Sequence, residues 1–442
     1  TGGDATGGSG GTGGTGGESS GGTGGTAEPT PDQAAIMGIE GTLARGIPGL
    51  SAPVHVVRTE ADIPHVYAAN RLDLARVHGF LVARDRFWMI DLARRLATGT
   101  TSALIGDVTL STDIASRAEG LPQVADRLLA AMSADQRAET EAFADGINAY
   151  VAAAQAGELP VPSELEVAAP LLGAEAPALL EPFTARDVAA FAAVIIQQGT
   201  CARSEIARTD ALQAALAAQA DAPLEAERRA GIRADLFDRV QPADPVTTSG
   251  AELKQAPPPP SGARKGQGLR FPPGLLPRVV AAQAERRRLA PKVLGSNAWA
   301  VDGAHAADGA ALLAGDGHLS LAVPAYFHQA GLDTAALGGE PWHVRGNFIP
   351  GLPPLGVGTN GQVAWSFTCF YSDTVDHYRE VVRLGADGLP DATRFDGAWQ
   401  PLAATVETYP TRAVPALGSV GGAVQVPRFE LFDGRRLIAI EG

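Results

Sequence analysis

The residue with the clearest chemical potential is Ser296, which follows Gly295 in the stretch VLGSNAWAVDG over residues 293–303. A serine hydroxyl is a weak nucleophile near neutral pH and needs a base. If the bond between the two residues were cut, Ser296 would gain a free α-amino group, whose pKa of about 7.7–8.0 lets it accept the hydroxyl proton. One residue would then supply both nucleophile and base. The alternative is a structural serine at the start of a strand.

Gly295 fits such a cut, because a residue without Cβ gives the Ser296 hydroxyl access to the preceding carbonyl and tolerates unusual backbone conformations. The hydroxyl would attack the Gly295 carbonyl, and hydrolysis of the resulting ester would separate the chain into two.

The acidic segment SDTVD over residues 372–376 is a second candidate site. Asp373 and Asp376 place two carboxylates beside a backbone carbonyl in one short loop, and Ca²⁺ prefers oxygen ligands. On spacing alone the alternative is a pair of turn residues. His318, in the sequence GDGH, is by itself typical of a turn histidine. The two cysteines, Cys201 and Cys369, form neither a CxxC pair nor a Cys/His metal motif, and no HExxH motif occurs.

The elements that must position these residues change character along the chain. Residues 54–57 and 65–67 predict a hairpin with a turn at 62–64. Apolar residues at three- and four-residue spacing predict a helix over 71–96. Ser133 with Gln136, and Thr184 with Asp187, are typical N-caps of two further helices. After Ser296 the pattern indicates strands and turns, with an Asn360-Gly361 hairpin. We therefore expect an α+β protein.

Charged residues on the first long helix should pair with one another on exposed or half-buried faces. This group comprises Asp85, Arg86, Asp91, Arg94 and Arg95.

Composition sets limits on the function. The chain has 442 residues, is 45% hydrophobic and carries a net charge of −14. That is enough apolar material for a large core, and the charge argues against non-specific nucleic-acid binding. No apolar run is long enough to span a membrane.

Four regions are expected from composition. They are a Gly/Thr-rich tether over 1–30, a mostly helical region over 31–240, a Pro-rich and basic spacer over 241–295, and the N-terminal part of a catalytic chain over 296–442. Because the sequence starts at Thr1, we expect removal of an export or lipoprotein signal, and hence a periplasmic or extracellular location with a possible lipid anchor. The alternative is that the sequence was simply begun at that residue.

Several motifs in order resemble the penicillin acylase family of N-terminal nucleophile amidohydrolases. The catalytic-chain motifs are GSNAWAVDG, GDGHLSLAVPAYFHQAGLD and NGQVAWSFTCFYSDTVDHYRE. The stretches ADIPHVYAANRLDLARVHGFLVARDRFWMIDLARRLATG, AFADGINAY and EPFTARDV are similar to the family's first chain. Each motif is weak alone, but their order and spacing over residues 54–380 make the set specific.

This resemblance implies a four-layer αββα sandwich wrapped by first-chain helices, incomplete in this chain. It implies self-cleavage before Ser296, an acyl-enzyme on Ser296, an oxyanion donor in the backbone N–H of Cys369, and a hydrogen bond from His318 that orients the serine. It also implies structural Ca²⁺ held by Glu205, Asp373, the carbonyl of Val375 and Asp376. The family's second oxyanion donor, a distant Asn, has no counterpart in the 147 residues from Ser296 onward. We therefore expect a fragment or a truncated gene product.

The expected partners are an acylated small-molecule amide and the second chain of a heterodimer cut from one precursor. The acyl group stays open between penicillin or cephalosporin side chains, acyl homoserine lactones and lipopeptide acyl chains. The rival hypothesis is a truncated, non-catalytic homologue that serves as a tethered binding module. Finally, Cys201 lies four residues before Glu205, and Cys369 lies four before Asp373. If both acids bind one ion, these cysteines could form a disulfide between the two chains.

Overall fold

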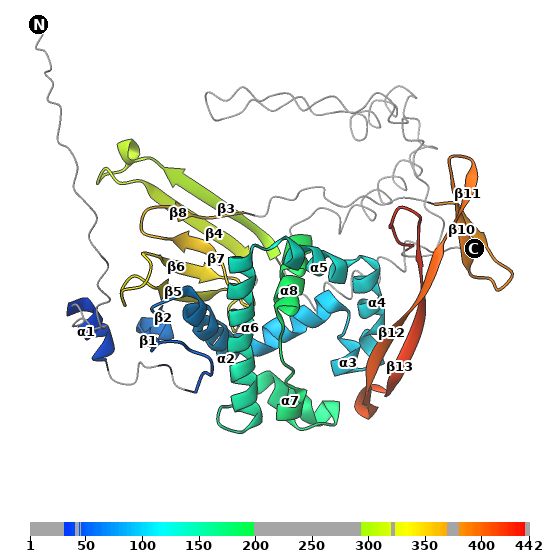
Figure 1. The fold of residues 1–442 in the computed structure, drawn as a ribbon, viewed down its shortest axis with the longest axis horizontal. Helices are drawn as coiled ribbons and strands as arrows, with labels where there is room; N and C mark the ends of the chain where they lie inside the picture. The colour runs from blue at the N-terminus through cyan, green and yellow to red at the C-terminus, as the bar shows by residue number, and fades with distance from the viewer. Residues whose placement is uncertain are drawn as a thin grey trace, which may run out of the picture.

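The computed structural model describes residues 31–39, 44, 46–198, 293–319, 323–368 and 380–437. A helical part formed by the segments up to residue 198 lies beside sheets formed mainly by the segments from residue 293 onward (Figure 1). The α+β class predicted from the sequence is confirmed at this level. Among the described residues, no helix combines the length and the apolar character needed to cross a membrane.

The α-helices of the described residues lie before residue 199. They are α1 (Pro31–Met37), α2 (Arg71–Thr98), α3 (Ser102–Ile105), α4 (Leu110–Ala118), α5 (Leu121–Ala131), α6 (Ala134–Gln155), α7 (Ser163–Leu172) and α8 (Ala185–Gln198). Short 3-10 turns lie at Glu60–Asp62, Asp107–Thr109, Ala176–Leu179, Gly303–His305 and Pro415–Leu417. Two predicted caps are confirmed: Ser133 and Gln136 form a reciprocal capping box on α6, and Asp187 accepts hydrogen bonds from Thr184 before α8.

Two glycines allow the long helices α2 and α6 to pack closely. A Cβ on Gly79 of α2 would collide with the backbone carbonyl of Phe143 on α6, and a Cβ on Gly146 of α6 would collide with that of Arg76. Around this crossing Phe87, Phe143 and other apolar side chains form a buried cluster. Only residues without a side chain permit backbones to approach this far.

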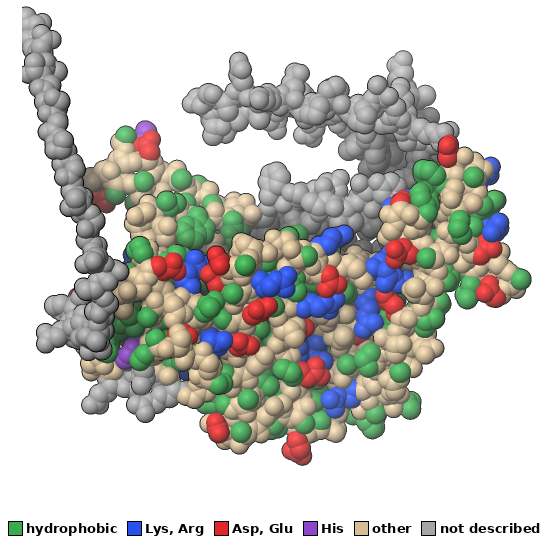
Figure 2. Space-filling model, viewed as in Figure 1, with side chains coloured by type: hydrophobic (Ala, Val, Ile, Leu, Met, Phe, Trp, Pro, Cys, Tyr) green, Lys and Arg blue, Asp and Glu red, His purple; other side chains and the backbone are tan. Residues whose placement is uncertain are grey.

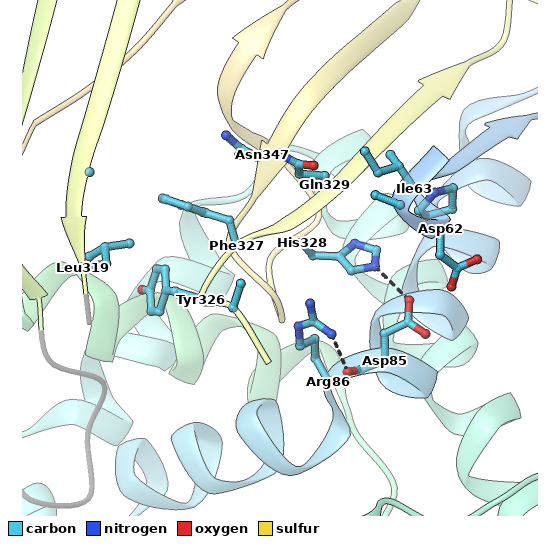
Figure 3. A pocket seen from close by; sticks show the side chains of 14 residues that line it. Asp62, Ile63, Asp85, Arg86, Leu319, Tyr326, Phe327, His328, Gln329 and Asn347 are labelled. Atoms are coloured by element: carbon cyan, nitrogen blue, oxygen red, sulfur yellow. Dashed lines mark hydrogen bonds and ion pairs between the residues drawn. The ribbon is translucent and has the colours of Figure 1, made fainter. Parts of the chain in front are cut away.

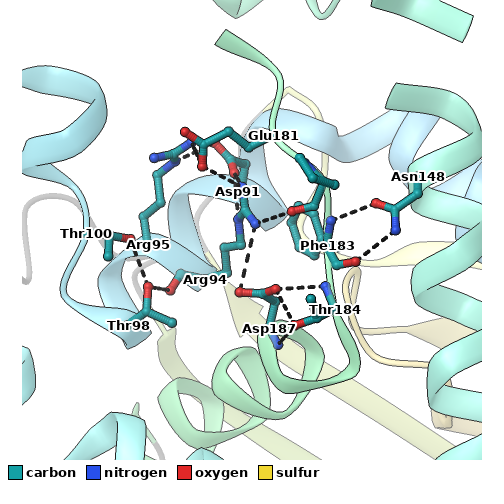
Figure 4. Close-up of polar contacts among 11 residues, drawn as sticks. Asp91, Arg94, Arg95, Thr98, Thr100, Asn148, Glu181, Phe183, Thr184 and Asp187 are labelled. Carbon is teal, nitrogen blue, oxygen red and sulfur yellow. Dashed lines mark hydrogen bonds and ion pairs between the residues drawn. The ribbon is translucent and has the colours of Figure 1, made fainter. Parts of the chain in front are cut away.

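An ion cluster is buried where α2 meets the segment before α8 (Figure 4). Asp91 is 0% exposed and lies 2.6 Å from Arg94 and 2.8 Å from Arg95. Arg95 also contacts Glu181 at 2.9 Å. Burial opposes the charge of Arg95, but Asp91 and Glu181 outweigh burial and raise its pKa. The pairing predicted among these residues is confirmed for Asp91, Arg94 and Arg95. Its expected exposed or half-buried location is wrong, since Arg94 and Arg95 lie in the core.

A six-stranded sheet combines strands from both sides of the predicted cleavage site. Its order is β1-β2-β5-β6-β7-β8, and β2 pairs with β5 in parallel, His65 beside Gly331. The strands are β1 (His55–Arg58), β2 (Pro64–Tyr67), β5 (His328–Asp333), β6 (His343–Phe348), β7 (Leu355–Thr359) and β8 (Ala364–Trp365). The predicted hairpins at residues 54–67 and at Asn360-Gly361 are both present.

The remaining strands form three separate antiparallel units. They are the hairpin β3 (Val293–Val301) with β4 (Leu312–Leu319), the group β9 (Val382–Leu384), β10 (Pro390–Phe395) and β11 (Ala398–Pro401), and the long hairpin β12 (Ala403–Val414) with β13 (Ser419–Glu430). The long hairpin binds the helical part: Ser102 donates to the Pro410 carbonyl, and the Asp107 N–H donates to Ser419. Segments about 300 residues apart in sequence are thereby joined.

Candidate active site

Ser296 lies within strand β3, so the predicted cleavage bond runs through an extended segment. Ser296 is paired with Gly317 of β4, and Gly295 with His318. The ladder shifts register between Val293 and Gly295, immediately before that bond. Irregularities of this kind re-aim side chains and often adjoin active sites.

The pairing fixes the face of the hairpin to which the Ser296 side chain points. Residues directly opposite one another in an antiparallel pair project to the same face, and the face alternates along each strand. Ser296 therefore shares a face with Gly317 and Leu319. Both of those residues line a cavity of about 750 Å³. Ser296 itself is half-buried, and its side chain is directed toward the side of the hairpin where this cavity lies.

The cavity lies between β4, the loop at 61–64, the kinked region of α2 and the strands β5 and β6 (Figure 3). Leu319, Phe327 and Ile63 contribute apolar surface, whereas Asp85 and Arg86 contribute charge. The lining thus combines apolar surface with charged and polar groups, which can fix the orientation of a bound small molecule.

Close packing places β4 beside the end of the six-stranded sheet. A side chain at Gly315 would collide with the hydroxyl of Ser366, which follows β8. Gly315 also lies on the face of the hairpin that carries Gly317 and, across the ladder, Ser296.

A hydrogen bond between the two halves of the chain forms one wall of the cavity. His328 Nε2 lies 3.1 Å from the Asp85 carboxylate, although 243 residues separate them. Asp85 also accepts from Arg84 at 2.9 Å. Behind this pair His78 is buried against Phe348 and Phe143, and within the described part of the chain neither of its ring nitrogens has a hydrogen-bond partner. Burial, with a further contribution from His328, holds the pKa of His78 well below its ordinary value.

Arg86 occupies a break in helix α2. Its backbone leaves the helical conformation at φ −145° and ψ 18°. Its Nη1 donates to the Asp85 carbonyl at 2.8 Å, and its Nε is buried without a hydrogen-bond partner in the described segments. Among the described residues no carboxylate lies within ion-pair distance of Arg86. The pairing expected for Arg86 from the sequence is therefore wrong, since Asp85 is bound to Arg84 and His328 instead.

His318 adjoins the predicted cleavage bond through its backbone, whereas its side chain lies on the face opposite Ser296. The imidazole Nε2 is 3.2 Å from Asn297 Nδ2 and 3.1 Å from Asp316 Oδ2. The structure thus brings His318 to the residue that follows the serine, on an exposed face of the hairpin.

The other predicted site residues lie outside the described part of the chain. These are the oxyanion donor Cys369, the Ca²⁺ ligands Glu205, Asp373, Val375 and Asp376, and the second cysteine, Cys201. Within the described segments, no group of three or more His, Cys, Asp or Glu side chains is arranged to hold a metal ion. The Ca²⁺ site and the disulfide stay predictions.

The cavity residues Asp85, Arg86 and His328 were missed as site residues by the sequence analysis. Asp85 and Arg86 occur in the helical stretch ARDRF and look there like surface charges. The one available signal is that charges of opposite sign adjoin each other between the apolar stretches GFLVA and FWMI of this helix. No local pattern could connect them to a histidine in a strand 243 residues away.

Comparison with known proteins gives consistent matches. The model of the family described as penicillin amidase matches residues 53–423. Penicillin acylase 2 proenzyme of Pseudomonas sp. (strain SE83) is 30% identical over 374 residues, which are 84% of this chain and 42% of that protein. Acyl-homoserine lactone acylase QuiP of Pseudomonas fluorescens (strain Pf0-1) is 26% identical over 368 residues, 82% of this chain and 39% of the relative. The chain spans about two-fifths of the length of these curated relatives.

One similar solved structure is that of a thermostable penicillin G acylase from Alcaligenes faecalis. It is 28% identical, with a TM-score of 0.35, and the match covers 45% of this chain and 97% of that one.

Proposed function

Because the chain belongs to the penicillin amidase family, we propose that it is an amidohydrolase precursor that cuts itself between Gly295 and Ser296 and then hydrolyses acyl amides through Ser296. The observation that carries this proposal is the placement of Ser296 on the hairpin face whose residues Gly317 and Leu319 line the cavity. A nucleophile there can reach a substrate held in the cavity.

The chemistry needs two acyl transfers at the same hydroxyl. In the first, Ser296 Oγ attacks the Gly295 carbonyl carbon, the C–N bond breaks, and water hydrolyses the ester. The products are a carboxylate on Gly295 and a free α-amine on Ser296. In the second, that amine takes the hydroxyl proton, Oγ attacks the amide carbonyl of the substrate, and the amine product leaves. Water then releases the acid from the acyl-enzyme.

The two fragments would stay associated after the cut, as the predicted heterodimer requires. Support comes from contacts that cross the cleavage site in sequence. The parallel pairing of β2 with β5 joins the fragments within one sheet, and Asp85 binds His328 beside the cavity. Strands buried in one sheet do not depend on the Gly295–Ser296 bond for their contacts.

The oxyanion that forms in each transfer needs donors. We assign one to the backbone N–H of Cys369. The position of Ser366, three residues earlier and against Gly315 of β4, supports this assignment. We assign His318 a positioning role: its contact with Asn297 would fix the strand next to Ser296.

Three further features remain part of the proposal. They are the full four-layer αββα arrangement, a structural Ca²⁺ held by Glu205, Asp373, Val375 and Asp376, and a periplasmic or extracellular location. The choice of Ca²⁺ is supported by the chemistry of the proposed donors, which all offer oxygen. The acyl group stays open between penicillin-type and homoserine-lactone-type substrates.

Hydrolysis of two candidate substrates tests the proposed activity. A phenylacetyl anilide and an N-acyl homoserine lactone are incubated with the parent protein, with Ser296→Ala and with the control Ser163→Ala on the exposed start of α7. We expect release of free amine from at least one substrate by the parent and the control, and none by Ser296→Ala. Equal hydrolysis by Ser296→Ala, or hydrolysis of neither substrate by the parent, would contradict the proposal.

A further inference from the structure

Arg86 is a positive charge that the cavity leaves without an opposite charge. The neighbouring charges are already paired: Arg58 lies 2.7 Å from Asp62, and Arg84 lies 2.9 Å from Asp85. In the described part of the chain, Arg86 makes no ion pair, and its Nη1 donates a hydrogen bond to a neutral carbonyl, that of Asp85. Its Nε is buried and has no hydrogen-bond partner among the residues that the structure describes. An unsatisfied buried donor on a charged group is costly, so such a group is suited to receive a ligand.

The geometry directs this charge into the cavity below the hairpin that carries Ser296. The break in α2 at Arg86 turns the guanidinium away from the helix, and Figure 3 shows it between Tyr326 and Asp85, below His328. Gly317, the cross-strand neighbour of Ser296, lines the same cavity. A molecule that extends from Ser296 past Gly317 into this cavity would therefore meet Arg86, which lines it.

We propose that Arg86 is a specificity-determining residue that binds a carboxylate on the substrate, so that this chain prefers acyl amides that carry a negative charge. This inference rests on the proposed function, because it names the substrate class of the same site. The planar fork of a guanidinium matches the geometry of a carboxylate. Leu319, Phe327 and Ile63 supply apolar surface for the carbon chain between the amide and the charge.

The carboxylate could belong to the acyl group or to the leaving amine, and two matched pairs of ligands distinguish these sources. For the acyl side the pair is glutaryl p-nitroanilide and valeryl p-nitroanilide. For the amine side the pair is 4-(phenylacetamido)benzoate and phenylacetanilide. Dissociation constants are measured by calorimetry on the purified protein, while release of free amine is followed separately.

In at least one pair, we expect the dissociation constant of the charged ligand to be at least about tenfold lower than that of its neutral partner. A factor of this size corresponds to one charge-assisted hydrogen bond. Arg86→Met should abolish this preference, and Arg86→Lys, which keeps the charge without the fork, should retain part of it. Arg127→Met removes an exposed arginine from α5 and should leave the preference unchanged.

Two results would overturn the proposal. One is the absence of any preference for the charged ligand in both pairs, and the other is a preference that survives in Arg86→Met. Should Arg86→Met fail to fold by circular dichroism, an undiminished preference in Arg86→Lys would count against the guanidinium. Binding with the expected preference but without amine release would sustain the assignment of Arg86 while contradicting the proposed hydrolysis.

Discussion

The helical part and the hairpin that carries Ser296 are positioned in different ways. Helices α2 and α6 are packed backbone to backbone at Gly79 and Gly146, and the Asp91 cluster is enclosed beside them. In the β3–β4 hairpin, by contrast, seven of the eight residues of β4 are exposed, and Trp299 of β3 is 53% exposed. The difference separates a framework held by its own core from a hairpin whose described contacts include its ladder and the close approach of Gly315 to Ser366.

The surface shows the same contrast. On the face seen in Figure 2, acidic and basic side chains are interspersed over the helical part, as expected for a solvated surface. The outer face of the hairpin instead carries exposed apolar residues, including Leu312 and Val301. We infer that substitutions in the framework change stability, whereas substitutions in the hairpin change chemistry.

The largest effect is expected from Asp91→Asn. This change leaves the buried Arg94 and Arg95 without their shared carboxylate, and breaking a buried ion pair costs about 3–5 kcal/mol. Urea unfolding, with parent and variant in the same state of cleavage, measures the loss. The control is Arg186→Met, which breaks an exposed pair with Asp126 and should cost less than about 1 kcal/mol. Equal losses in both variants would remove the contrast between core and surface.

A smaller loss is expected from Gly146→Ala. Alanine is the better helix former by about 1 kcal/mol, yet its Cβ would collide with the Arg76 carbonyl. Overpacking of this kind costs about 1–3 kcal/mol. The sign of the measured change in the free energy of unfolding therefore shows whether overpacking outweighs the gain in helix propensity. Ala152→Val adds bulk on the exposed face of the same helix and serves as control. Stabilisation by Gly146→Ala would show that the two backbones are not in contact.

Low pH should lower the free energy of unfolding of the helical part, because His78 is protonated more readily in the unfolded chain than in the folded one. Its pKa is depressed in the folded protein, so below the ordinary value of about 6.5 the unfolded chain binds a proton that the folded chain does not. The stability that His78 contributes is complete above pH 6.5 and falls by roughly 1 kcal/mol per pH unit below it. His78→Phe keeps a ring between Phe143 and Phe348 and should flatten this pH dependence.

Urea midpoints at pH 7.0 and 5.5 measure the effect of His78. His305→Asn, at an exposed position, is the control and should behave as the parent does. An unchanged pH dependence in His78→Phe would mean that other groups cause the acid sensitivity.

The smallest effect on stability is expected from Trp299→Ala in the hairpin. The indole is more than half exposed, and surface substitutions usually change stability by less than about 0.5 kcal/mol. The same urea assay measures it beside Phe143→Ala, for which removal of a fully buried ring should cost about 3–5 kcal/mol. A loss of more than about 2 kcal/mol from Trp299→Ala would show that the outer face of the hairpin is part of a core.

Local signals in the sequence predicted the local structure well. The apolar spacing over residues 71–96 predicted α2, and the Ser133–Gln136 cap predicted the start of α6, because both depend on residues within one or two turns. Likewise the strand around Ser296 followed from its own apolar pattern. The family resemblance then singled out Ser296, which no local pattern distinguishes from a structural serine.

Contacts between distant residues could not be predicted in this way. The second ion pair of the buried Arg95 is made with Glu181, which lies in another segment. Among the described residues Arg86 lacks an ion pair because Arg84 and His328 bind the neighbouring Asp85 carboxylate. Such features are set by tertiary packing, which the spacing of charges along a helix does not predict.

The intact mass of the purified protein, beside that of Ser296→Ala, tests the central claim most directly. The account predicts two fragments in the parent, one ending at Gly295 and the other beginning with a free amine on Ser296, and a single chain in the variant. A single uncut chain in the parent, or the same cut in Ser296→Ala, would contradict self-cleavage by the Ser296 hydroxyl.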